Sequence, residues 1–126
     1  METYVEFRSN HFSSVEQLTM TLFEQLKNEG IQVNEPYNED WGWAIPVSND
    51  AFPLWIGCGH YEEYTDGFLC FIEPSKPDVR KFIFKKIPTE KKVATVQKTL
   101  NKVLAQNEEI HNIKWWTEYD FNHPST

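Results

Sequence analysis

The sequence has few of the residues that form covalent, metal or phosphate-binding sites. Its two cysteines make no CxxC motif, no two of its four histidines have HxxxH spacing, and its five glycines form neither GxGxxG nor a Walker motif. No apolar run approaches the ~20 residues that cross a bilayer, and the N-terminal residues lack the basic and apolar regions of a signal peptide. We therefore expect no cofactor, no metal, no catalytic motif and no membrane partner, and a cytoplasmic location.

The composition is that of an ordinary globular protein with an unusual supply of aromatic residues. The chain has 126 residues, of which 40% are hydrophobic and 25% charged, and these values fit one domain over residues 1–126. Aromatic residues make up 15%, with nine Phe, five Tyr and five Trp. Five tryptophans are more than a small core readily encloses, since the indole N–H needs a hydrogen-bond partner. We expect at least one of them on a working surface.

The formal charge of −7 is unevenly distributed along the chain. Residues 80–102 contain eight basic residues and one acid, Glu90, whereas the rest contains four basic residues and eighteen acids. Such a separation predicts a dipolar molecule that steers oppositely charged partners to different faces. The alternative is a solvated lysine-rich helix with its neighbouring strand.

Two helices are predicted from apolar spacing and end signals. Ser13-Ser14-Val15-Glu16 matches a capping box and opens a helix over about 14–28, with Gly30 as its stop. A second helix is expected over 89–106, with Thr89 as its N-cap. The apolar stripes that should face the core include Leu18, Leu22, Val96 and Leu100.

Strand signals occupy most of the remaining chain. Residues 68–72 are almost continuously apolar and are expected to be buried on both sheet faces, and the tail over 110–121 predicts a short strand or ordered extension. The order of elements predicts an α+β fold, with a mainly antiparallel sheet of about five strands and two helices on one face. One sheet face would then stay open. The strands are expected at 3–8, 41–47, 54–58, 68–72 and 79–85.

The candidate partner-binding site combines tryptophans with carboxylates. In Glu39-Asp40-Trp41-Gly42-Trp43, two acids lead into a strand-like alternation that should place Trp41 and Trp43 on one face. Glu62 and Glu63 add an acidic loop. Trp residues anchor protein interfaces, and carboxylates attract basic partners. The alternative is that the tryptophans complete the core.

Two further hypotheses use other residues. Cys58 and His60, two apart on one strand, would suit a small-ligand-binding or hydrolytic domain with nearby carboxylates. The paired glycines around Cys58 more simply predict a bulge or a close backbone approach. If residues 58–70 form a hairpin centred on Tyr64, Cys58 and Cys70 face each other and a disulfide is geometrically allowed.

Nucleic-acid binding is disfavoured. The lysine-rich stretch interleaves with Phe82, Ile83 and Phe84, as in base-stacking RNA sites. However, it has a single Arg, no RNP-like signature, and a strongly negative remainder that repels phosphates.

In size, acidity and expected layering, and without a shared motif, the chain is similar to bacterial toxin-neutralising immunity proteins. That resemblance implies a small cytoplasmic antitoxin-type protein that binds a basic toxin, and it assigns no residue. The sequence therefore predicts a protein-binding domain rather than an enzyme, and it leaves the oligomeric state open.

Overall fold

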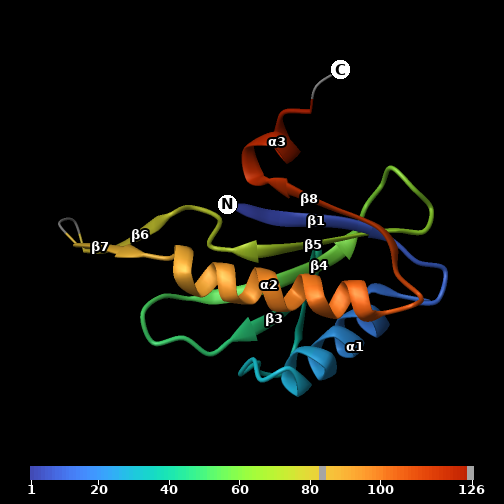
Figure 1. Ribbon diagram of the computed structural model, residues 1–126, viewed down its shortest axis with the longest axis horizontal. Coiled ribbons are helices and arrows are strands. Elements are labelled where there is room, and N and C mark those ends of the chain that lie inside the picture. The colour runs from blue at the N-terminus through green and yellow to red at the C-terminus, as the bar shows by residue number, and fades with distance from the viewer. Residues whose placement is uncertain (83–84, 125–126) are drawn as a thin grey trace.

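The computed structural model describes residues 1–82 and 85–124 as an α+β domain (Figure 1). Its main sheet has the strand order β2-β3-β4-β5-β1-β8, and every neighbouring pair is antiparallel. The α+β class with an antiparallel sheet is confirmed, although the main sheet is larger than the five strands expected. Its strands are β1 (Glu2–Arg8), β2 (Tyr37–Glu39), β3 (Gly42–Val47), β4 (Leu54–His60), β5 (Gly67–Glu73) and β8 (His111–Thr117).

Helices α1 (Val15–Asn28) and α2 (Glu90–Gln106) cover one face of this sheet (Figure 1). Their apolar stripes pack against alternate residues of the strands, which is the arrangement that a one-sided sheet requires. Leu18, Leu22 and Leu100 are fully buried and Val96 nearly so, as predicted. The core also contains Val5, Phe7, Ile45, Ile56, Phe68, Cys70 and Ile72.

The two helix starts differ in detail from the sequence prediction. The N-cap of α1 is Ser14, whose side chain accepts a hydrogen bond from the Gln17 amide, while Gln17 Oε1 accepts from the Ser13 amide. The capping pair is therefore one residue later than predicted, because Gln17 serves where Glu16 was expected. Thr89 is the N-cap residue of α2, as predicted, but its hydroxyl donates to the Lys76 carbonyl oxygen and makes no capping hydrogen bond to the helix.

The predicted strand over 79–85 is wrong in form. It is a separate hairpin, β6 (Asp78–Phe82) and β7 (Lys85–Pro88), which extends from one end of the main sheet (Figure 1). The sequence did not show the reversal, because most residues of both strands are exposed, many of them lysines, and they produce no clear alternation. Ile83 and Phe84, which the strand and RNA hypotheses used, lie outside the described residues.

The C-terminal segment completes the sheet and then turns over it. The expected tail strand is present as β8, which pairs with β1, and a short helix, α3 (Glu118–Asn122), follows. Trp115 faces the helices and donates from Nε1 to Asn101 of α2 at 2.9 Å. Phe121 of α3 stacks on Tyr4, so α3 lies partly on the opposite sheet face.

Candidate functional site

The sheet face opposite α1 and α2 carries the candidate site, which we call the open face. Strand residues alternate between faces, so β1 directs Val5 and Phe7 into the core and Tyr4 to the open face. The register places one row of residues across all six strands on this face. In order from β2 to β8, the row is Tyr37, Ala44, Gly57, Phe71, Tyr4 and Trp116.

Gly57 gives this row its shape. A Cβ atom on Gly57 would lie 2.8 Å from Phe71 Cε2 and closer still to two other ring atoms, so the Phe71 ring occupies the space that a side chain would take. A ring laid over a cross-strand glycine compensates for the packing that glycine lacks. The glycine therefore positions Phe71 flat against the sheet, beside Trp55 and Tyr4.

The aromatic rings of the open face form a continuous cluster. Ring centroids are 5.7 Å apart for Trp41 and Trp55, 5.2 Å for Trp41 and Phe71, and 5.5 Å for Phe71 and Tyr4. Tyr4 stacks on Phe121 at 4.9 Å, and these separations lie in the range that stabilises aromatic pairs. Tyr61 and Tyr64 extend the chain of contacts toward the β4–β5 loop. We define the open-face cluster as Tyr4, Trp41, Trp55, Tyr61, Tyr64, Phe71 and Phe121.

Carboxylates lie among these rings as well as around them. Glu73 pairs with Trp55 across β4 and β5, and its pKa is raised by burial and by the nearby Glu118 carboxylate. Burial, Glu73 and Glu118 likewise raise the pKa of the Tyr4 hydroxyl. Glu118 also accepts a hydrogen bond from the Ser75 hydroxyl. A raised carboxyl pKa means that the ionised form of Glu73 is destabilised at this position. A cationic group of a partner would stabilise that ionised form.

The predicted site residues divide between the two sheet faces. Trp41 is 46% exposed and lies on the open face, whereas Trp43 packs against the core on the helix side. The shared face predicted for this pair is therefore wrong. The chain reverses at Asp40 and Trp41, so the alternation begins only at Gly42, and Trp41 belongs to the turn.

The four predicted carboxylates are exposed and lie at one end of the sheet. Glu39 and Asp40 are at the β2–β3 turn, and Glu62 and Glu63 are in the β4–β5 loop. Because β3 and β4 are antiparallel and Trp43 is opposite Cys58, the first residues of β3 and the last residues of β4 lie at the same end of the sheet. The two acidic loops therefore frame the end of the open face where Trp41 sits.

Sequence reasoning missed most of the open-face cluster. Phe71 was expected to be buried on both sides with the rest of residues 68–72, yet it is only partly buried and lies on the open face. A signal was present in β4, where Trp55, Gly57 and Gly59 alternate with the core residues Ile56 and Cys58. Two glycines beside one tryptophan indicate that another segment covers that side of the strand.

The Cys58 and His60 arrangement does not form an accessible reactive site. Cys58 is 0% exposed and faces Cys70, with the sulfur atoms 3.7 Å apart as free thiols. The contact with Cys58 and complete burial hold the pKa of the Cys70 thiol well above its usual value. His60 is exposed and stacks on Phe68. The cross-strand pairing of the cysteines is confirmed, but Cys58, the proposed nucleophile, is fully buried and has no access to a substrate.

The lysine-rich stretch is divided between the hairpin and α2. The hairpin contributes Arg80, Lys81, Lys85 and Lys86 at the end of the molecule away from the acidic loops (Figure 1). On α2, Lys102 forms an ion pair with Glu29, with Nζ and Oε1 2.6 Å apart. The strongest spatial separation of charge is thus between the hairpin and the acidic loops.

Comparison with known proteins adds no family to this description. The chain matches no protein-family model, no curated protein and no solved structure. Within residues 1–82 and 85–124, no helix is long and apolar enough to cross a membrane, and no group of three or more His, Cys, Asp or Glu residues is placed to hold a metal ion.

Proposed function

We propose that this protein binds a basic protein through the open face. The observation that carries the proposal is the open-face cluster, a continuous set of aromatic rings on a sheet face that α1 and α2 leave uncovered. Trp41 and Tyr64 are exposed and the other rings of the cluster are partly exposed, and a contiguous apolar patch on a water-facing sheet commonly marks an interaction site. Aromatic anchors of this kind supply most of the binding energy in protein interfaces.

The charge of the site selects the chemistry of the partner. Glu39, Asp40, Glu62 and Glu63 form an exposed acidic rim at one end, and Glu73 places a further carboxylate beside Trp55. Rim charges accelerate encounter with a positive surface, while the central rings supply contact area that excludes water. A basic protein satisfies both requirements, whereas a nucleic acid would be repelled by the same carboxylates.

The more specific form of the proposal is an immunity or antitoxin-type protein that neutralises a basic toxin in the cytoplasm. The small size, the net charge of −7 and the acidic rim support it. Neutralisation by binding needs no catalytic residue, and the burial of Cys58 removes the nucleophile on which the hydrolytic alternative depends.

The test uses the products of the genes on either side of its own. One product should arrest bacterial growth when expressed alone, and co-expression with the wild-type protein should restore growth. Trp55→Ala, on the open face, should abolish this rescue, whereas Met20→Ala, an exposed apolar residue of α1, should retain it. If neither neighbouring product is toxic or bound, the antitoxin form is wrong.

Binding measured by surface plasmon resonance then separates the antitoxin form from the broader proposal. A purified basic partner should bind more weakly as salt rises, since exposed charges are screened beyond about 8 Å at physiological ionic strength. Equal affinity of the Trp55→Ala and wild-type proteins would place the interface elsewhere.

A further inference from the structure

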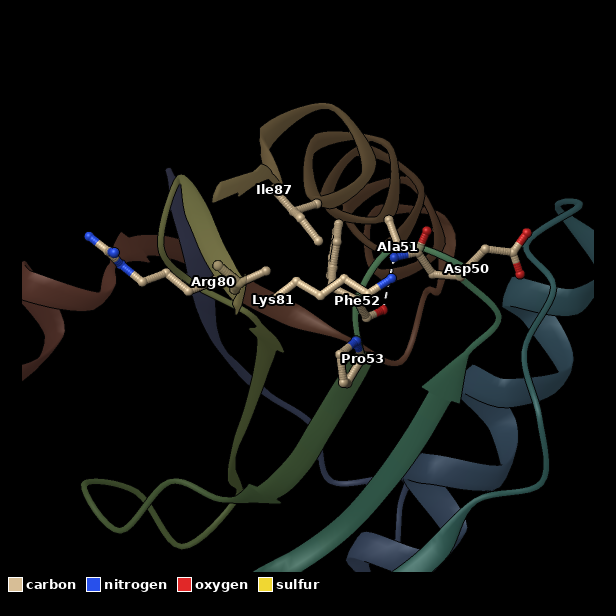
Figure 2. Close-up of a pocket in the computed structure, with 9 residues that line it drawn as sticks. Asp50, Ala51, Phe52, Pro53, Arg80, Lys81 and Ile87 are labelled. Atoms are coloured by element: carbon tan, nitrogen blue, oxygen red, sulfur yellow. Dashed lines mark hydrogen bonds between the residues drawn. The ribbon is translucent and has the colours of Figure 1, made fainter. Parts of the chain in front are cut away.

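A second candidate site lies at the opposite end of the molecule, between the β6–β7 hairpin and the β3–β4 loop (Figure 2). We call it the hairpin groove. Its volume is about 540 Å³, which falls within the size range of ordinary ligand sites. The residues that line it come from the loop at 49–53, from 79–81 of β6 and from Ile87 of β7.

The floor of the groove is apolar and firmly supported. Val79 and Ile87 pair across the hairpin and both pack against the core. Phe52, on the loop side, is 5% exposed, and its carbonyl oxygen accepts a 2.9 Å hydrogen bond from Asn49 Nδ2 that holds the loop in shape. These residues form a hydrophobic surface that an apolar side chain of a ligand can contact.

Basic residues of the hairpin lie in the groove and near it. In Figure 2 the Lys81 side chain runs along the groove toward the loop, while Arg80 points away from it. Lys81, Lys85 and Lys86 are exposed on the hairpin, and Asp50 is the one carboxylate among the groove's lining residues. An anionic occupant is therefore favoured over a cationic one.

The groove lies beside β6, which has one unpaired edge in the described chain. Val79 and Lys81 of β6 line the groove together with Ile87, the cross-strand partner of Val79 on β7, and the β6–β7 pairing is irregular between Arg80 and Phe82. In the described chain β6 pairs with β7 alone, which leaves its second edge without a partner strand. Lysines commonly protect such edges from aggregation, but protection alone does not require an apolar groove beside the edge.

We propose that the hairpin groove binds an extended acidic segment of a partner protein. The segment would add to β6 as a strand and seat an apolar side chain against Phe52, Val79 and Ile87. Its carboxylates would lie beside Lys81 and the other hairpin lysines. Strand addition draws affinity from backbone hydrogen bonds and specificity from side-chain pockets; the second edge of β6 would supply the hydrogen bonds and the groove would supply the pocket. The site is independent of the open face, and its occupant has the opposite charge.

The test begins with a phage-displayed library of linear heptapeptides selected on the purified full chain. The enriched peptides should combine Asp or Glu with an apolar residue. A synthetic copy of one such peptide should bind Lys81→Glu at least tenfold more weakly than wild type. Lys98→Glu makes the same charge change at an exposed position of α2, and it should bind the peptide with nearly wild-type affinity. Equal losses in the two variants would show non-specific charge attraction and overturn the proposal.

Two further measurements examine the binding mode. Methylating alternate backbone nitrogens of the peptide should reduce its affinity at least tenfold, because strand addition needs those donors. Amide NMR shifts should concentrate at Ala51, Phe52 and residues 79–81. Shifts confined to α2 or to the open face would contradict the groove. Displacement of the peptide by an oligothymidylate that shifts the same amides would assign the site to nucleic acid instead and overturn the proposal of a protein partner.

Discussion

Substituting Gly57 tests the packing on which the open-face cluster depends. A Cβ atom at this position would overlap the Phe71 ring. That ring already contacts the rings of Trp55, Trp41 and Tyr4. The ring cannot move without disturbing those neighbours. Gly57→Ala should therefore lower the free energy of unfolding by about 1–3 kcal/mol, the usual cost of an overpacked site.

The same substitution should have the opposite sign once the ring is absent. In a Phe71→Ala background the space above Gly57 is empty, and alanine is favoured over glycine within a strand by about 0.5–1 kcal/mol. Adding Gly57→Ala to Phe71→Ala should thus leave stability unchanged or raise it. The change of sign distinguishes a steric clash with Phe71 from a backbone requirement for glycine, which would penalise alanine in both backgrounds.

Urea unfolding of the four proteins, followed by circular dichroism, gives the coupling between the two positions directly. Gly59→Ala is the matched control, because its nearest contact would be the Trp41 carbonyl oxygen at 3.4 Å. That variant should change stability little in either background. If Gly57→Ala costs the same with and without Phe71, the ring does not rest on the glycine and the description of the open face is wrong.

Three other outcomes are expected. Leu22→Ala should cost about 2–5 kcal/mol in urea unfolding, and a cost below about 0.5 kcal/mol would show that α1 faces the core differently. Because the pKa of Glu73 is raised in the folded state, the protein should lose stability as pH rises from the ordinary glutamate pKa through the raised value. Glu73→Gln should remove that loss in unfolding midpoints measured from pH 4 to 7, and an unchanged profile would contradict the pKa shift. Reversing Glu39 and Asp40 to Lys should slow association with the basic partner, and Trp41→Ala should speed dissociation; plasmon resonance traces with unaltered rates would exclude the acidic end from the interface.

The parts of the fold that sequence predicted are those with one buried face and clear ends. Leu18 and Leu22 of α1 and Leu100 of α2 belong to apolar stripes with helical spacing, and they are buried as expected. A helix with one face in the core and the other in water needs apolar residues at this spacing. The central strand β5 was located differently, from the nearly continuous apolar run at 68–72. The β6–β7 hairpin was not predicted, since most of its residues are exposed and impose no clear period on the sequence.

The candidate site was predicted in composition better than in geometry. Trp41 and the acidic loops lie on or beside the open face, but Trp43 does not, because a turn at Asp40 and Trp41 shifts the start of the alternation. Phe71 and Tyr4 join Trp41 through strand pairing between distant segments. That pairing depends on register, which a local pattern of residues does not specify.

The strand order has a consequence for how the chain folds. β1 lies between β5 and β8 in the sheet, and Tyr4 pairs with both Phe71 and Trp116. Both strands that pair with β1 therefore come much later in the sequence. Closing such long loops before any contact is gained makes folding slow relative to proteins with local pairing. On a ribosome, β1 would leave the exit tunnel well before β5 and would wait longest for β8. During that interval both edges of β1 are unpaired, and the N-terminal strand is the segment most in need of protection from aggregation.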